Sequence, residues 1–247
     1  MPKFFVNNEQ IDNNIIRILG KDVNHISNVL RHKVNDSIEI CNNDNGQNYD
    51  ACIIGINKDT IICKIKSIKS NNSETNTSIT LFQGLPKSDK MEYIIQKNVE
   101  IGVKTIIPVE MERCVVKLDD KNRKKKIERW QKISEVAAKQ SGRDTIPEIG
   151  ELINMKKVCE SISKYDIVLV AYENEKENTL KSELKKIKTT NKLNIGIIIG
   201  PEGGIDQKEI FELKNCGAKI ITLGSRILRT ETASLVVLSN IIYEIEM

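Results

Sequence analysis

The sequence predicts an α/β protein of two domains, a small β-rich module followed by a larger domain in which strands and helices alternate. In the first seventy residues, short apolar runs are separated by pieces rich in Asn, Asp and Gly. Residues 67–78 are small and polar, a composition typical of a linker or a long surface loop. We therefore assign the module to residues 1–70, a linker to 71–78 and the larger domain to 79–247.

The β-rich module is predicted to be a small β-barrel or β-sandwich. Its strand-like runs cover residues 38–41, 51–56 and 61–68. Residues 22–31 carry Val23, Ile26, Val29 and Leu30 at helical spacing, which predicts one short helix with Asp22 as its N-cap.

The larger domain is predicted to hold a mostly parallel sheet covered by helices, because its β and α segments alternate. Strands are expected at 79–83, 105–109, 167–171, 195–199 and 219–223. Helices are expected at 87–101, 121–140, 207–215 and 230–245. The last helix is apolar on more than one side. Packing inside its own domain and packing against a second subunit both satisfy that pattern.

Composition excludes several classes of protein. The opening residues lack the apolar region of a signal peptide, and no apolar run is long enough to span a bilayer, so the default expectation is a cytoplasmic protein without membrane contact. The six cysteines form no Cys-x-x-Cys pair and only two histidines are present. We therefore expect reduced thiols and no metal site.

Positive charge is concentrated in residues 117–132, although the net charge of +4 is only mildly basic. Such a segment can bind a phosphate backbone, or it can be a solvated helix face. Charge alone favours the solvated face.

The segment Gly200-Pro201-Glu202-Gly203-Gly204 follows a β-branched run and precedes Asp206, a suitable N-cap for the next helix. Ligands of open α/β sheets bind at the carboxyl ends of strands, where glycines allow close approach to the backbone. Taken alone, the segment is also compatible with a simple strand-to-helix turn. It matches neither the Rossmann fingerprint nor the P-loop, which favours a nucleoside cofactor without a phosphate chain, and S-adenosylmethionine is the common one.

A second glycine loop covers residues 223–233. Gly224 is suited to positive φ, and Ile227 with Leu228 offers apolar surface for an adenine ring. Thr230 and Glu231 can cap the last helix, while Arg229 is placed to pair with an anion. The cofactor-binding residues predicted from the two loops are Ile199, Gly200, Pro201, Glu202, Gly203, Gly204, Leu223, Gly224, Ser225, Ile227, Leu228 and Arg229.

These loops resemble the signature of the ribosomal RNA small subunit methyltransferase E family, uridine-N3 methyltransferases of the SPOUT class. Further matching motifs lie along the whole chain, among them 25–31, 96–103, 112–113, 129–130 and 137–147. The resemblance implies a PUA-like β-barrel before an α/β methyltransferase domain whose backbone forms a deep trefoil knot. It also implies S-adenosylmethionine as cofactor, 16S ribosomal RNA or the small ribosomal subunit as partner, and a homodimer.

Transfer of a methyl group to uridine N3 requires loss of the imide proton, and a cation beside the uracil carbonyls would stabilise the resulting anion. Arg229 is therefore the predicted catalytic residue. The predicted RNA-binding residues are Lys3, Arg31, Arg113 and Arg143, since basic side chains can bind phosphates and stack on bases. A surface ion pair is the alternative role for each. Two other functions stay open, a SPOUT enzyme acting on another RNA or position, and an RNA-binding or ribosome assembly factor without catalysis.

Overall fold

The computed structural model describes residues 3–70, 73–187 and 192–246, and it divides into two compact units. The first unit comprises the chain up to Glu74 together with Ala138–Ile146, and the second comprises Thr75–Ala137 and the chain from Pro147 onward. Residues 71–72 of the expected linker lie outside the described residues.

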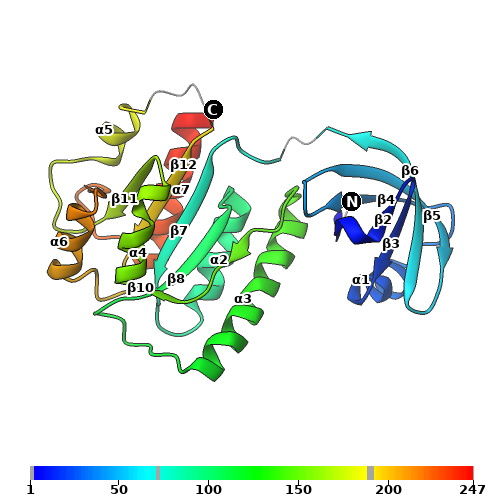
Figure 1. Cartoon of the computed structure of the whole chain (residues 1–247), viewed down its shortest axis with the longest axis horizontal. Helices are drawn as coiled ribbons and strands as arrows, with labels where there is room; N and C mark the ends of the chain where they lie inside the picture. The colour runs from blue at the N-terminus through cyan, green and yellow to red at the C-terminus, as the bar shows by residue number, and fades with distance from the viewer. Residues whose placement is uncertain (1–2, 71–72, 188–191, 247) are drawn as a thin grey trace. The chain divides into compact units, whose positions relative to one another are not determined.

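The first unit contains a curled, mixed β-sheet with the strand order β1-β4-β5-β6-β3-β2 (Figure 1). β1 is parallel to β4, and the other neighbours are antiparallel. The strands are β1 (Lys3–Val6), β2 (Ile11–Asp12), β3 (Ile15–Leu19), β4 (Ser37–Asn42), β5 (Asn48–Ile56) and β6 (Thr60–Lys69), with a short 3-10 turn η1 (Asn8–Gln10). Isoleucines such as Ile16, Ile40 and Ile53 fill the core and are fully buried. The three strands expected from the sequence are present.

The helix of this unit differs from the prediction. α1 (Lys21–Asn24) continues into a π-helical turn, η2 (His25–Val29), and the residue before the helix is Gly20 rather than Asp22. Gly20 has φ of 72°, a backbone conformation that glycine adopts without steric cost. The turn ends before Arg31, which has φ of 56°. The predicted N-cap, Asp22, was chosen for its side chain. The helix instead begins after Gly20, because glycine can adopt the backbone conformation needed there.

A charge cluster in which Lys3, Arg143 and Asp144 are buried holds residues 138–146 in the first unit. Asp144 accepts hydrogen bonds from Lys3 Nζ at 2.6 Å and from Asn48 Nδ2 at 2.5 Å. Glu74 accepts two hydrogen bonds from the Arg143 guanidinium, at 2.8 and 2.6 Å, and one from the Asp144 N–H at 2.8 Å. Residues 138–146, which the sequence predicts to lie in the larger domain, belong to the first unit. These pairs join residues about seventy or more positions apart, which sequence patterns do not reveal.

The second unit contains a parallel sheet with the strand order β10-β8-β7-β12-β11-β13, and β9 pairs with β8. Its strands are β7 (Ser78–Gly84), β8 (Thr105–Glu110), β9 (Glu148–Ile149), β10 (Ile153–Asn154), β11 (Ile167–Ala171), β12 (Asn194–Ile199) and β13 (Lys219–Ile221). All pairings between these strands are parallel, as the alternation of segments predicted. The central strand β12 pairs with β7 over its whole length, from Asn194 opposite Ser78 to Ile199 opposite Gln83.

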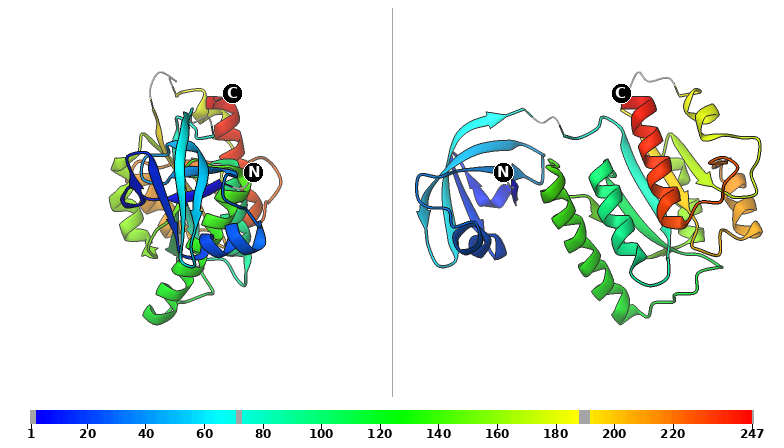
Figure 2. Two further views of the ribbon diagram at one scale, coloured as in Figure 1. Left: turned by 90° about the vertical axis from the view of Figure 1, so that its right-hand side faces the viewer. Right: turned by 180° about the vertical axis from the view of Figure 1, so that it is seen from behind.

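Helices cover both faces of this sheet. They are α2 (Lys90–Ile101), α3 (Asp120–Ser141), α4 (Met155–Ser161), α5 (Leu180–Leu184), α6 (Gln207–Asn215) and α7 (Thr230–Glu246), with a 3-10 turn η3 (Ile162–Lys164) after α4. α2 and α7 pack together on one face, and α4 lies on the other (Figures 1 and 2). The four helices predicted in this domain are present, whereas the short α4 and α5 were not predicted. None of the described helices combines the length and apolarity needed to cross a lipid bilayer.

We expect Asp144→Ala to destabilise the first unit by about 3 kcal/mol, because it leaves the buried Lys3 ammonium with only the more distant Glu39 carboxylate, at 3.8 Å. Urea unfolding followed by circular dichroism measures this change. Burial opposes ionisation of Asp144, but hydrogen bonds from Lys3, Asn48 and Ser73 outweigh it and hold the pKa below its usual 3.8. The stabilisation should therefore be complete above that value and be lost as the pH falls through the lower pKa of the folded state.

The matched control is Asp12→Ala, because Asp12 is an exposed carboxylate 3.8 Å from Arg17 in the same unit. Its loss should cost less than about 1 kcal/mol. Equal effects of the two variants would contradict the role assigned to Asp144.

Candidate functional site

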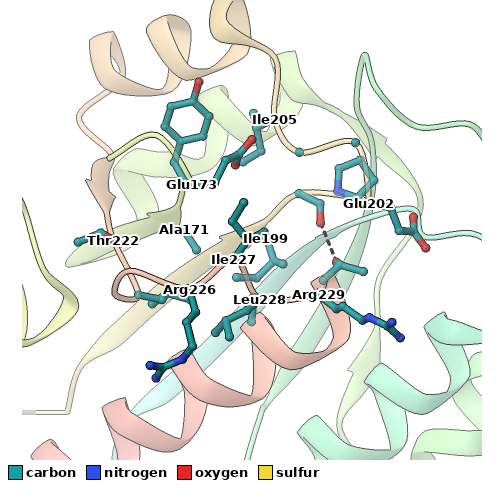
Figure 3. Close-up of a pocket in the computed structure, with 18 of the residues that line it drawn as sticks. Ala171, Glu173, Ile199, Glu202, Ile205, Thr222, Arg226, Ile227, Leu228 and Arg229 are labelled. Carbon is teal, nitrogen blue, oxygen red and sulfur yellow. Dashed lines mark hydrogen bonds between the residues drawn. The ribbon is translucent and has the colours of Figure 1, made fainter. Parts of the chain in front are cut away.

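A cavity of about 450 Å³ opens at the carboxyl ends of β11, β12 and β13 in the second unit. The loop after β12, the loop after β13 and the start of α7 form most of its wall, and Figure 3 shows these side chains around the cavity. The carboxyl ends of parallel strands meet at one edge of a sheet, so the two glycine loops come together although some twenty residues separate them. Every residue predicted to bind the cofactor lines this cavity.

The first loop is closed on itself. A Cβ on Gly200 would lie 2.8 Å from the Ile205 side chain, and Gly204 has φ of 72° with its N–H bonded to the Pro201 carbonyl at 3.0 Å. A Cβ on Gly204 would also lie 2.5 Å from Oε1 of Glu173, so the Glu173 carboxylate sits directly over the loop. The glycines are therefore required by the close packing of backbone and carboxylate at the cavity wall.

Two neighbours fix the end of this loop. Asp206 caps α6, and its side chain accepts from the Lys208 N–H at 3.0 Å, as the sequence predicted. Arg113 donates to the Gly203 carbonyl and to the Asp206 carboxylate, at 3.2 Å each. Contacts from the helix that follows the loop and from Arg113, after β8, therefore hold the end of the loop in place.

The second loop offers apolar surface to the cavity. Gly224 has φ of 108°, as predicted, and its N–H bonds to Thr222 Oγ1 at 3.2 Å. Ile227 is 86% exposed and Leu228 is half-buried. An apolar side chain this exposed in a cavity wall can contact the face of a planar ligand.

Thr230 joins the two loops through a buried network. Its hydroxyl donates to the Gly200 carbonyl at 2.7 Å, the bond drawn dashed in Figure 3, and it accepts from Gln83 Nε2 at 2.9 Å. Thr230 is the first residue of α7. The sequence predicts that its hydroxyl caps the helix, but in the structure the hydroxyl bonds to Gly200 and Gln83 instead. Glu231 lies in the first turn of α7, as predicted. The network fixes one loop against the other.

Lys90 joins the start of α2 to the cavity. Its ammonium lies 3.1 Å from Glu202 of the first loop and 3.3 Å from Glu231 of α7. The bond to Glu202 raises the pKa of Lys90. Burial opposes ionisation of Glu202, but hydrogen bonds to its carboxylate and the Lys90 charge outweigh it, so the pKa of Glu202 is lowered. Lys90 and Glu202 are therefore both charged at neutral pH.

Sequence analysis did not identify Gln83, Lys90 and Glu173. Gln83 is the last paired residue of β7 beside β12, and Lys90 begins the helix that follows. Both therefore reach the site only because β7 lies next to β12 in the sheet. The order of strands in the sheet, which segment patterns do not give, was the missing information.

The cations predicted to act in function have different surroundings. Arg229 lines the cavity and is exposed, and among the described residues it has no ion-pair partner (Figure 3). Arg113 is partly exposed but engaged with the first loop, and Arg31 is exposed in the first unit. Lys3 and Arg143 are only 7% and 4% exposed; Lys3 is paired with the buried Asp144, and Arg143 is paired with Glu74, which is exposed. Their charges are engaged by carboxylates of the first unit, and RNA binding by Lys3 and Arg143 stays a prediction.

Comparison with known proteins identifies the family. An RNA methyltransferase domain matches residues 73–242, and an RNA methyltransferase PUA domain matches residues 18–66. The ribosomal RNA small subunit methyltransferase E of Bacillus subtilis is 37% identical over 232 residues, which cover 93% of this chain and 90% of that protein. The protein of the same name from Mesomycoplasma hyopneumoniae is 35% identical, with 98% and 99% covered.

The fold agrees with a solved relative. A crystal structure of a ribosomal RNA small subunit methyltransferase E from Neisseria gonorrhoeae, bound to S-adenosyl methionine, is 30% identical with a TM-score of 0.86 and covers 98% of this chain and 97% of that one. The chain belongs to the ribosomal RNA small subunit methyltransferase E family. The family resemblance, the PUA and methyltransferase domains and the RNA methyltransferase class predicted from the sequence are thereby confirmed.

We expect Thr230→Val to loosen both loops and to cost about 1–3 kcal/mol, because it leaves the buried Gln83 amide and Gly200 carbonyl without their partner. Faster amide hydrogen exchange at residues 199–205 would report the change. Thr230→Ser should restore slow exchange, since it keeps the hydroxyl. The control is Thr232→Val, because Thr232 is exposed two residues later in the same helix. Unchanged exchange in Thr230→Val would show that the network does not hold the loops.

Proposed function

From membership of this family, we propose that the protein transfers a methyl group from S-adenosylmethionine to N3 of a uridine in 16S ribosomal RNA. The observation that carries the proposal is the single cavity formed by both glycine loops at the carboxyl ends of the parallel strands. The S-adenosyl methionine bound to the Neisseria relative supports the choice of cofactor.

The residues of the cavity fit this cofactor. Ile199, Ile227 and Leu228 provide apolar surface for an adenine ring, and the open space beside Gly224 leaves the backbone accessible to a ligand. The Glu173 and Glu202 carboxylates also line the cavity. Carboxylates repel a phosphate chain and attract a cationic ligand, which agrees with the absence of a phosphate-loop motif. The two loops would hold the nucleoside, with Thr230 and Lys90 keeping their positions.

The protein's own contribution to the reaction is positioning and charge. When bound, S-adenosylmethionine supplies an electrophilic methyl group; the new bond forms to N3 as the sulfonium carbon–sulfur bond breaks, and the N3 proton leaves to solvent. The N3 edge is used for pairing in a duplex, so the target base must be unpaired or extruded to reach the cavity. Arg229 would stabilise the negative charge that develops on the uracil carbonyl oxygens. Lys90 is held by two carboxylates, whereas the two exposed arginines of the cavity, Arg226 and Arg229, have no ion-pair partner among the described residues.

Methyl transfer from labelled S-adenosylmethionine to small ribosomal subunits tests the proposal. Subunits from a strain that lacks the enzyme should accept label, and subunits from the parent strain should not, because their site is already methylated. Mass spectrometry of the nucleosides should find 3-methyluridine. Label in another nucleoside would indicate a different position or RNA, and no transfer would favour an assembly factor.

We expect Arg229→Met to lower kcat about 10²–10³-fold, the cost of removing one group that stabilises a developing anion. Cofactor affinity measured by calorimetry should change little. The control is Arg226→Met, because Arg226 is an exposed arginine of the same loop that lines the same cavity. A loss of cofactor affinity as large as the loss of kcat would instead make Arg229 part of the cofactor site.

The proposed assembly is a homodimer. Leu235, Val236 and Tyr243 lie on α7 but stay outside its buried face, and Tyr243 is 68% exposed. An apolar surface of this kind on a terminal helix supports packing against a second copy. Sedimentation velocity would show twice the mass of one chain. A ribosomal substrate also agrees with the expected cytoplasmic location.

A further inference from the structure

A second cavity, here called the α2–α3 groove, lies between helices α2 and α3 of the second unit and measures about 660 Å³. Its walls include Tyr93 of α2 and Lys125, Arg129, Lys132 and Val136 of α3. The two helices run side by side (Figures 1 and 2). Neither the cofactor cavity nor the proposed reaction uses this groove.

The groove exposes apolar and aromatic surface. Tyr93 is 49% exposed and Val136 is 64% exposed, whereas the other face of α2 is buried through residues such as Ile94 and Ile95. A Tyr ring with an open face is a platform on which a nucleobase can stack, and such stacking tolerates any base. The groove therefore offers the apolar half of a binding site for single-stranded nucleic acid.

Basic side chains border the same surface. Lys125 and Lys132 are seven residues apart, about two helical turns, so they lie on one face of α3. Arg129 lies between them and is ion-paired with Glu92, Nε to Oε1 at 2.8 Å and Nη2 to Oε2 at 3.0 Å. This pair uses the charge of Arg129, whereas the exposed lysines on either side present theirs at the edge of the groove. Two positive charges along one helix face can neutralise phosphates of one strand.

Helix α2 contributes side chains both to the groove and to the cofactor cavity. Lys90 lines the cofactor cavity and Tyr93, less than one helical turn further along α2, lines the groove. A target base removed from its stack leaves its neighbours along the strand without stacking partners. A stacking surface on the same helix as the cofactor cavity is suited to receive one of those neighbours.

We propose that the α2–α3 groove binds the single-stranded RNA next to the target nucleotide, with a base stacked on Tyr93 and phosphates at Lys125 and Lys132. This inference rests on the proposed function, because it takes RNA as the substrate. It gives the basic segment at 117–132 a role beyond that of a solvated helix face.

Equilibrium binding of a fluorescent single-stranded oligouridine RNA to the full chain tests the groove. Tyr93→Leu keeps an apolar side chain but removes the ring and should weaken binding about tenfold. Tyr93→Phe should bind as the wild type does. Lys125→Gln with Lys132→Gln should lower the slope of log affinity against log salt by about 1.4, which corresponds to two phosphate contacts.

The matched controls lie on α6 and β13, which pack together at the opposite edge of the sheet. Phe211→Leu removes an exposed aromatic ring there, and Lys208→Gln with Lys219→Gln removes two exposed lysines. Both controls should leave RNA affinity and salt slope unchanged. Effects as large as those of the groove variants would mean unspecific attraction and would overturn the inference.

Two further outcomes separate the groove from its premises. Unchanged RNA affinity in Tyr93→Leu, with methyl transfer to uridine intact in the wild type, would overturn the groove and leave the proposed function standing. Weaker RNA binding in the groove variants of a protein that transfers no methyl group would support the groove and overturn the function. If Tyr93→Leu dissociates the protein into monomers with RNA affinity unchanged, the groove is an interface between copies and the inference fails.

Discussion

The bond from the Thr230 hydroxyl to the Gly200 carbonyl is the interaction on which the site depends. It ties the first residue of α7 to the end of β12, and Gln83 holds the same hydroxyl from β7. Three elements distant in the sequence are thereby fixed at one buried point. Since a cavity built from two loops keeps its shape only while the loops stay in register, a hydroxyl of one residue sets the geometry of both walls.

The parallel sheet explains why those elements can meet. β7, β12 and β11 are neighbours, so their carboxyl ends share one edge, and the segments that follow them contribute Lys90, the first loop and Glu173. The basic side chains at this edge differ in their ion pairing. Lys90 is engaged by two carboxylates, whereas the Arg229 guanidinium forms no ion pair within the described part of the chain, so its charge stays available to a substrate.

Much of this arrangement could be predicted from the sequence, because periodicity and glycine placement are local properties. The limits of α6 agree with the prediction, and both glycine loops were identified. Features that depend on contacts between residues far apart in the sequence could not be predicted. Gln83 and Lys90 required the order of strands, and the buried roles of Lys3 and Arg143 required knowledge that Asp144 and Glu74 lie opposite them. The backbone knot stays a prediction that rests on the family resemblance.

The placement of residues 138–146 limits how the gene for such a protein can be divided between its two units. The first unit takes its central carboxylate, Asp144, from a segment encoded after most of α3, so no contiguous stretch of the gene specifies that unit. A fragment ending near residue 70 would encode Lys3 without Asp144, and a fragment beginning near residue 79 would carry Arg143 without Glu74. A single recombination point between the two units would therefore separate residues that form ion pairs within the first unit. This favours inheritance of both units together in one gene.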